Sequence, residues 1–409
     1  MTKINEKPDI RFAGFTDPWE QRKLGEMASS TFGGGTPATS NEGYWNGSIP
    51  WIQSSDLIEN ALSGVIPRKH ISKEGLIKSA TKLVPENSIA IITRVGVGKL
   101  AFMPFSYTTS QDFLSLSRLN IDPWFGVYSC YKKLQSELHE VQGTSIKGIT
   151  KDELLEKSIS VPGMNEQKQI GKFFSNLDNL ITLHQRKYEK LKNVKKSCLE
   201  KMFLKDGEKA PKLRFAGFTD PWEQRELGDY AKFRRGSFPQ PYGNKEWYDG
   251  EDAMPFVQVV DVTDRLELVD NTKQKISKVA QSMSVYVSKG KILVTLQGSI
   301  GRVAITQYDA FVDRTILIFE DFNEITDKYF WAYTIQQKFD IEKQIAPGGT
   351  IKTITKEALS SFTILIPKIE EQTQIGIFFK TLDNLITLHQ RELEKLKNIK
   401  KSLLEKMFA

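Results

Sequence analysis

Basic and amide side chains with the chemistry of DNA recognition recur along the chain, in segments where short apolar runs alternate with glycine and polar residues. Arginine and lysine can pair with a guanine edge and glutamine with an adenine edge, whereas contact with a phosphate requires only positive charge. As a group, we expect several of these side chains to touch DNA. The candidates are Gln53, Arg68, Lys69, Arg94, Lys99 and Lys147 in the first half and Arg234, Arg235, Gln258, Gln297, Arg302, Arg314 and Lys352 in the second.

A solvated surface charge is the competing interpretation for any single residue of this set, because lysine and arginine are mostly exposed. Two related segments, GTSIK (Gly143–Lys147) and GGTIK (Gly348–Lys352), are candidates for a loop whose backbone amides and hydroxyls hold a phosphate. Their glycines suit an ordinary turn equally well. Both interpretations of these two segments stay open at this point.

The residues and motifs of catalysis are scarce in this sequence. There are four histidines and two cysteines, Cys130 and Cys198, without the paired spacing of metal ligands. The sequence has no GxxxxGK[ST] phosphate loop. It also has no NPPY-like tetrapeptide for adenine methylation and no glycine-rich S-adenosylmethionine pocket. These observations favour a binding protein without a catalytic site, a metal or a cofactor of its own.

The segments that must position the candidate residues occur twice in the sequence. Arg11–Glu26 returns as Arg214–Asp229 with two of sixteen positions changed, and Glu166–Phe203 returns as Glu371–Phe408 with 30 of 38 positions identical. Self-similarity at one long period indicates a duplication of the whole chain. Between these constant segments, residues 27–142 and 230–347 share only fragments. We therefore predict two units with one fold and two different binding surfaces.

The shared fragments align several candidate residues. IPWIQSSDL corresponds to MPFVQVVDV, which places Gln53 with Gln258 and Asp56 with Asp261. RVGVGKLAF corresponds to QGSIGRVAI, which places Lys99 with Arg302. Neutral drift after duplication would scatter changes evenly, whereas here they concentrate between nearly unchanged blocks. The pattern favours a selected difference between the two surfaces.

Residues 166–203 and 371–408 are predicted to be long helices, because they lack proline and their apolar residues, among them Leu180, recur at helical spacing. Each would be about 55 Å long. Sustained heptads predict a coiled-coil seam, with the two copies pairing antiparallel about a pseudo-twofold axis. The seam residues are Ile170, Leu177, His184, Leu191 and Cys198 in the first helix and Ile375, Leu382, His389, Leu396 and Leu403 in the second. We interpret the two histidines as polar seam residues that fix register, and not as metal ligands.

The predicted fold class is α+β, with two mixed α/β units separated by two long antiparallel helices. β-Branched runs such as Ser88–Thr93, Lys291–Leu296 and Thr315–Phe319 predict strands. Each unit should close with a short helix, capped by Thr150 or Thr355, and a strand at Ser158–Val161 or Thr363–Ile366. Trp19 and Trp222 are expected to be packing anchors. The predicted boundaries are 1–162 for the first unit with its constant segment 11–26, 163–204 for the first helix, 205–213 for a linker, 214–367 for the second unit and 368–409 for the second helix.

The overall charge is compatible with a polyanionic partner. The formal net charge is +7 and the isoelectric point is near 9.0, and cationic proteins gain affinity for DNA by releasing its counterions. The sequence has no apolar run long enough to span a membrane and no secretion signal at its start. We therefore expect a cytoplasmic protein that does not bind membranes.

This arrangement resembles the specificity subunits of Type I restriction–modification systems. The resemblance covers essentially the whole chain: a variable unit, the segment GTSIKGITKDEL, then ISVP and the long helix, and all of these again. It includes the pattern P-x-x-x-E-Q-x-x-I-x-x-F-F-x-x-L-D-x-x-I, which runs from Pro162 to Ile181 and from Pro367 to Ile386.

The resemblance implies a function and a set of partners. Each variable unit would be a target recognition domain that reads one half of a bipartite site in double-stranded DNA, and the helices would set the spacer between the halves. Two methylation subunits would dock on the scaffold, and two restriction subunits with motor and nuclease activity would complete the complex. S-adenosylmethionine, ATP and Mg²⁺ would be used by those partners and not by this chain.

Three other functions remain compatible with the residues alone. A standalone architectural DNA-binding protein would not co-purify with a methyltransferase. An enzyme with unrecognised motifs would show activity on DNA with magnesium and S-adenosylmethionine. A coiled-coil adaptor that does not bind DNA would lack salt-dependent DNA binding.

Overall fold

The structure is a computed structural model that describes residues 7–140, 148–204, 208, 210–345 and 356–408. The chain forms two compact units. Unit 1 comprises Met1–Gln185 and Arg391–Ala409, and unit 2 comprises Arg186–Gln390. Each unit therefore combines one variable segment with part of both long helices, and each is described by itself below.

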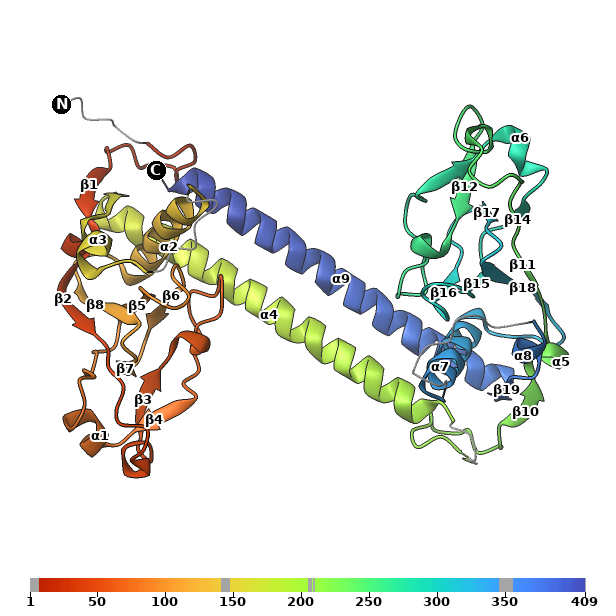
Figure 1. Cartoon of the computed structure of the whole chain (residues 1–409), viewed down its shortest axis with the longest axis horizontal. Helices are drawn as coiled ribbons and strands as arrows, with labels where there is room; N and C mark the ends of the chain where they lie inside the picture. Colours follow the sequence, from red (N-terminus) through yellow and green to blue (C-terminus); the bar gives the residue numbers. More distant parts are fainter. Residues whose placement is uncertain (1–6, 141–147, 205–207, 209, 346–355, 409) are drawn as a thin grey trace. The chain divides into compact units, whose positions relative to one another are not determined.

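Within residues 7–140 and 148–185, the strands of unit 1 form three small sheets (Figure 1). A four-stranded antiparallel sheet has the order β2-β8-β5-β6, a three-stranded sheet has the order β4-β3-β7, and β1 pairs with β9. In the three-stranded sheet, β3 runs parallel to β7 and antiparallel to β4. The strands are β1 Glu20–Lys23, β2 Ala28–Gly33, β3 Ile49–Ile52, β4 Lys69–Ile71, β5 Ser88–Ile92, β6 Leu100–Met103, β7 Thr108–Thr109, β8 Phe113–Leu119 and β9 Ser158–Val161.

Unit 2 repeats this topology with one additional strand. Its sheets have the orders β11-β18-β15-β16, β13-β12-β17-β14 and β10-β19. The pair β12 and β17 is again parallel. The strands are β10 Glu223–Glu226, β11 Ala231–Arg235, β12 Met254–Val257, β13 Gln274–Ile276, β14 Val285–Val287, β15 Ile292–Thr295, β16 Val303–Ile305, β17 Ala310–Val312, β18 Ile316–Phe322 and β19 Thr363–Ile366. The prediction of one mixed α and β fold built twice is confirmed.

The strand predictions are confirmed at β5, β15 and β18 and at the two closing strands β9 and β19. All residues of β5 and β15 are buried, as expected for short apolar runs rich in β-branched residues. The short 3-10 helices are η1 Leu24–Met27, η2 Glu42–Tyr44, η3 Ser54–Asp56, η4 Lys245–Trp247 and η5 Val259–Asp261. The short α-helices are α1 Lys73–Ile77, α3 Lys151–Glu156, α5 Leu227–Tyr230, α6 Lys278–Gln281 and α8 Lys356–Ser360.

Capping side chains fix where the helices begin. The capping box predicted for α3 is present, because the Glu153 backbone N–H donates to Thr150 Oγ1 at 3.2 Å and the Thr150 N–H donates to Glu153 Oε2 at 2.7 Å. Thr355, the predicted cap of α8, lies outside the described residues. The longer helices α2 (Pro123–Glu140) and α7 (Lys328–Ile345) start after Asp122 and Asp327. Each of these aspartates accepts a backbone N–H from the first turn.

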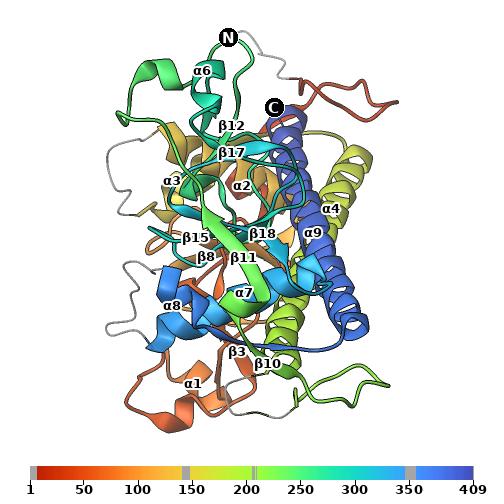
Figure 2. The same ribbon diagram turned by 90° about the vertical axis from the view of Figure 1, so that its right-hand side faces the viewer.

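The two long helices are α4 (Met164–Met202) and α9 (Ile369–Met407). In each unit a segment of one helix lies beside a segment of the other (Figures 1 and 2). In unit 1, Phe174 of α4 packs on Phe408, and Asp178 pairs with Lys400 of α9. Moving toward the start of α4 is therefore moving toward the end of α9. The helices are antiparallel, as predicted.

The end of each long helix completes the core of the unit that belongs to the other repeat. Phe408 stacks on Phe125 of α2 in unit 1, with ring centroids 5.5 Å apart. Phe203, at the equivalent position after α4, stacks on Phe330 of α7 in unit 2 at 5.7 Å. Trp19 and Trp222 are 7% exposed and pack edge-on against Phe125 and Phe330. Their predicted role as packing anchors is confirmed.

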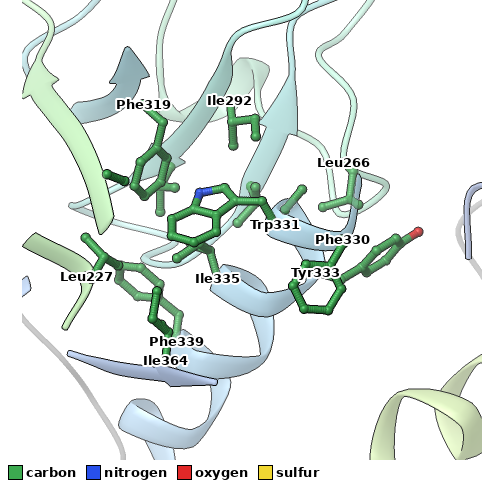
Figure 3. Close-up of a cluster of buried hydrophobic side chains, with 14 of the residues drawn as sticks. Leu227, Leu266, Ile292, Phe319, Phe330, Trp331, Tyr333, Ile335, Phe339 and Ile364 are labelled. Carbon is green, nitrogen blue, oxygen red and sulfur yellow. The ribbon is translucent and has the colours of Figure 1, made fainter. Parts of the chain in front are cut away.

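The core of unit 2 surrounds Trp331 (Figure 3). Its indole is fully buried and lies 5.3 Å from the Phe319 ring and 5.2 Å from the Tyr230 ring. Residues of α7, β15, β18 and β19 meet there, so that helix α7 is fixed against the sheet. The hydroxyl of Tyr333 points away from this cluster in Figure 3.

In each unit a tyrosine of α2 or α7, an aspartate of one long helix and a lysine of the other long helix form one cluster. In unit 1, Tyr128 Oη donates to Asp178 Oδ2 at 2.6 Å, and Lys400 Nζ lies 2.6 Å from Asp178 Oδ1. In unit 2 the same arrangement consists of Tyr333, Asp383 and Lys195. The lysine Nζ also lies over the tyrosine ring, at 5.6 Å in unit 1 and 5.1 Å in unit 2. Burial, together with the aspartate charge, raises the pKa of both tyrosines.

Candidate DNA interface

The loops at one edge of unit 2 are tied together by backbone hydrogen bonds. The Asp313 N–H donates to Val257 O at 3.0 Å, and the Leu296 N–H donates to Thr315 O at 2.8 Å. Gln258 directly follows Val257, Gln297 follows Leu296, and Arg314 lies between Asp313 and Thr315. Three of the predicted residues therefore leave neighbouring strand ends at one edge.

A buried aspartate shapes the turn that carries Arg314. Asp313 is 5% exposed, and its Oδ1 accepts the Thr315 N–H at 2.9 Å and the Thr315 hydroxyl at 2.5 Å. Arg314 itself is exposed, and its guanidinium carbon lies 5.3 Å from the centre of the Phe238 ring. A cation over an aromatic face loses some of its freedom but keeps its outer N–H groups. Arg314 can therefore present donors to a partner in a restricted orientation.

Arg235 reaches the same edge from the end of β11. The next residue, Gly236, donates its N–H to Ile316 O at 3.0 Å. A Cβ at Gly236 would lie 2.2 Å from Val312 O, so that only glycine permits this close approach. Arg234 points elsewhere, because its guanidinium pairs with Glu320 on the adjacent strand β18.

Arg302 closes the loop that Gln297 opens. Its backbone N–H donates to Thr295 Oγ1 at 3.0 Å, and its Nη1 donates to Val262 O at 3.3 Å. One backbone bond is shared with unit 1: the Thr295 N–H donates to Arg302 O at 2.9 Å, and the Ile92 N–H donates to Lys99 O at 3.0 Å. The predicted correspondence of Lys99 with Arg302 therefore holds at the level of the backbone.

Unit 1 gathers its candidates at the equivalent edge. The Ser110 N–H donates to Ile52 O at 2.9 Å, and the Thr93 N–H donates to Asp112 O at 2.7 Å. These bonds bring Gln53 and Arg94, the residues that follow Ile52 and Thr93, to one group of loops.

The turns after β3 and β12 are built alike. The Gln53 N–H donates to Asp56 Oδ2 at 3.0 Å, and the Gln258 N–H donates to Asp261 Oδ2 at 2.8 Å. Both aspartates are buried and both glutamines are half-buried. The predicted alignment of Gln53 with Gln258 thus describes one turn used twice.

Arg68 and Lys69 flank the Gln53 turn. Arg68 Nε lies 3.5 Å from Asp56 Oδ1, and 67% of the Arg68 side chain is exposed. Lys69 lies opposite Trp51 in the β3–β4 pair. Its Nζ is 5.5 Å from the Trp45 ring centre and 5.7 Å from that of Trp51. Both cations are therefore available at the surface.

Gln111 is a candidate that the sequence reasoning missed. It is exposed and precedes strand β8, as Arg314 precedes β18. Its Oε1 accepts the Thr36 hydroxyl at 2.6 Å. The sequence signal is weak, because SQD and DRT share no residue at equivalent positions. Lys147 and Lys352, with the GTSIK and GGTIK segments, lie outside the described residues.

The ten predicted seam residues are all buried or half-buried. His389 is 8% exposed, and His184 is half-buried. By contrast, Leu180, which shares the helical spacing of the seam, is 41% exposed. The contact between the two helices therefore buries fewer apolar residues than recur at helical spacing in the sequence.

Within residues 7–140, 148–204, 208, 210–345 and 356–408, no three histidine, cysteine, aspartate or glutamate side chains gather as metal ligands would. In the same part of the chain, no helix combines the length and apolarity that crossing a membrane requires. Cys130 is fully buried, and burial raises the pKa of its thiol to about 12.

Two similar loop edges with different arginine, lysine and glutamine side chains, on a scaffold built twice, are what is expected of a DNA-binding protein with two recognition surfaces. The profile of the Type I restriction modification DNA specificity domain family matches the chain twice, at residues 16–193 and 219–398. The chain belongs to this family. It is a DNA-recognition subunit of a Type I restriction–modification system and is not itself catalytic.

Similar proteins and similar solved structures match this chain over almost its full length. The type I restriction enzyme MjaIX specificity subunit of Methanocaldococcus jannaschii is 25% identical over 420 residues, which cover 95% of this chain and 92% of the relative. The S subunit of the Type-I restriction-modification system from M. genitalium superposes with a TM-score of 0.64 at 15% identity, covering 99% of each chain. A chain from a structural study of complex assembly in the type I R-M system gives a TM-score of 0.50 at 17% identity, covering 95% of this chain and 97% of that one. The two structural matches show a shared fold.

Proposed function

We propose that each unit reads one half of a bipartite site in double-stranded DNA and that the two long helices set the spacer between the halves. The parts have the boundaries predicted above: residues 1–162 and 214–367 would recognise DNA, and residues 163–204 and 368–409 would set the spacer. Linking two weak readers raises affinity through effective concentration.

The observation that carries this proposal is the contrast between equivalent edges. The turns of Gln53 and Gln258 have the same hydrogen bonds. The side chains around them differ at equivalent positions. Unit 1 has Lys69 opposite Trp51 and Gln111 before β8, whereas unit 2 has Gln274 opposite Phe256 and Arg314 before β18. A shared frame with different donors is expected if the two edges read different bases.

Two methylation subunits are the partners that the long helices would receive. Leu180 and Leu183 of α4 are 41% and 61% exposed, and the equivalent Leu385 and Leu388 of α9 are 38% and 52% exposed. Exposed leucines repeated at equivalent positions support two equivalent docking sites. In the complete complex, two restriction subunits would join them. S-adenosylmethionine, ATP and Mg²⁺ would be bound by these partners in the cytoplasm.

Mapping methylated adenines in the host genome, with and without this gene, tests the proposal. We expect one bipartite motif with a fixed spacer to lose methylation when the gene is removed. Complementation with Arg314→Ala should relax one half of the motif, and Gln53→Ala should relax the other, since a lost base contact costs about 1–3 kcal/mol of discrimination. An unchanged methylation map after gene removal would contradict the proposed function.

A further inference from the structure

A groove of about 330 Å³ in unit 2 has a lining rich in cations. Arg265 comes from the turn after η5, Lys289 precedes β15, Lys328 begins α7, and Lys380 belongs to α9. All four side chains are exposed. The groove therefore lies where the variable part of the unit meets a long helix, away from the edge that carries Gln297.

Few negative charges oppose these cations. The lining contains two carboxylates, Glu267 and Asp383. Asp383 is already engaged, because it accepts the Tyr333 hydroxyl and its Oδ1 lies 2.6 Å from Lys195 Nζ. Glu267 is thus left against four cationic side chains, and the groove is an attractive environment for an anion.

One of the groove lysines is held over an aromatic ring. Lys380 Nζ lies 4.5 Å from the centre of the Tyr329 ring. Lys328 Nζ would lie 3.5 Å from a Cβ at residue 290, which is a glycine with a φ of +89°. That distance is an ordinary van der Waals contact, so the positive φ, and not Lys328, favours glycine at this position. The distance places the Lys328 ammonium group beside the turn that precedes β15.

The positive charge is not required to build the scaffold. Lys380 occupies one of the eight positions at which the two constant segments differ, and the other copy has Ser175 there. Lys328 opens α7 where α2 opens with Pro123. The Asp122 and Asp327 caps next to these residues are equivalent, so the backbone is the same with or without the lysine. Lys328 and Lys380 therefore have no cationic counterpart at the equivalent positions of unit 1.

We propose that this groove binds a phosphate of the DNA backbone beside the half-site that unit 2 reads. The inference rests on the proposed function and adds an anchoring contact to it. Ammonium and guanidinium groups pair with phosphodiester oxygens irrespective of base sequence. The four cations are exposed, so a phosphodiester group can approach them from solvent. A free phosphate would share this chemistry, and the experiment separates the two sources.

The test measures binding of the full chain to a short DNA duplex of mixed sequence across a series of salt concentrations. The variant combines Lys289→Ser, Lys328→Ser and Lys380→Ser. Its matched control combines Lys187→Ser, Lys190→Ser and Lys196→Ser, three exposed lysines of unit 2 on α4 outside the groove lining. Each lost phosphate contact lowers the slope of log K against log salt by about 0.9. Because the groove is proposed to hold one phosphate, we expect the groove variant to lose about 0.9 of a unit of slope and the control to lose less than about half of that.

Two further variants make the result specific. Lys380→Arg should retain the slope, because a guanidinium also pairs with phosphate. Ser175→Lys should leave the slope unchanged, because its surroundings lack the other cations of the groove.

Three outcomes would overturn the proposal. Equal losses in the groove variant and its control would assign the effect to general charge. An unchanged slope, together with binding of inorganic pyrophosphate by the wild-type chain and not by the groove variant, would assign the groove to a free anion. If the wild-type chain itself bound the duplex without salt dependence, the proposed function would fail, and this result is distinguishable from failure of the groove alone.

Discussion

Glu166 and Glu371 are buried carboxylates, 1% exposed each, and each is held by one arginine. Arg11 donates to both oxygens of Glu166 at 2.6 and 2.8 Å, and this hydrogen bonding raises the pKa of the Arg11 guanidinium. Removing one partner leaves a buried charge uncompensated. We predict that Arg11→Gln, which leaves the buried Glu166 carboxylate without its cation, lowers the free energy of unfolding of unit 1 by about 3 kcal/mol, as measured by urea titration.

The matched control is Arg22→Gln, which breaks the exposed pair between Arg22 and Glu20 in the same unit. The two side chains of that pair are 40% and 69% exposed. Exposed pairs contribute less than about 1 kcal/mol. Equal losses in the two variants would mean that the buried pair adds nothing beyond a surface contact.

For single residues, the turn that carries Gln53 and Gln258 could be predicted from the sequence. The side chains that surround this turn could not. Gln53 and Gln258 were identified because their flanking apolar residues match in the two copies. The pairing of Arg234 with Glu320 depends on the register of β11 against β18. These two strands are far apart in the sequence, so no local pattern predicts the pair. Gln111 was missed for the same reason, since strand ends, and not sequence similarity, place it with Gln53.

The long helices make their own prediction at the scale of the element. Insertion of four residues at matched points of α4 and α9 lengthens each helix by about 6 Å. If the helices set the spacer, the permitted distance between half-sites should grow by about two base pairs of about 3.4 Å each. The spacer is read directly from the methylated motifs in the host genome.

The same four residues inserted in the predicted linker 205–213 provide the control. They leave both helices at their natural length, so the spacer should stay as it is. A spacer that is unchanged by the helix insertion, or that changes with the linker insertion, would contradict the role of the helices in spacing.

The helices were predictable as elements, because heptads and the absence of proline are local properties. The part of the molecule that each helical turn contacts was not predictable. Tyr128 and Tyr333 meet the aspartates of the long helices through tertiary packing, and no spacing in the sequence points to these contacts. The exposure of Leu180 shows the same limit, since helical periodicity marks apolar residues but does not tell which of them a partner helix covers.

At the scale of the whole molecule, the core of each unit is completed by the helix of the other repeat. Phe408 is 6% exposed and packs on Phe125 and Phe174. Replacing a buried phenylalanine with alanine costs about 3–5 kcal/mol. We predict that Phe408→Ala makes unit 1 the first part of the chain to be cleaved in limited proteolysis followed by mass spectrometry.

Ile399→Ala is the control for this experiment. Ile399 lies on the same helix within unit 1 but is 38% exposed, so its truncation should cost less than about 1 kcal/mol. First cleavage of Phe408→Ala in unit 2, or a rate equal to that of the Ile399 variant, would show that Phe408 does not hold unit 1 together.

The dependence of unit 1 on residues 403–408 also has a consequence for biosynthesis. A ribosome makes the sheets of the first unit early, yet Leu404, Met407 and Phe408, which close its core, emerge only after the entire second unit has been translated. The first reader therefore matures last. A polypeptide that terminates before residue 403 therefore has a first unit whose core is left open.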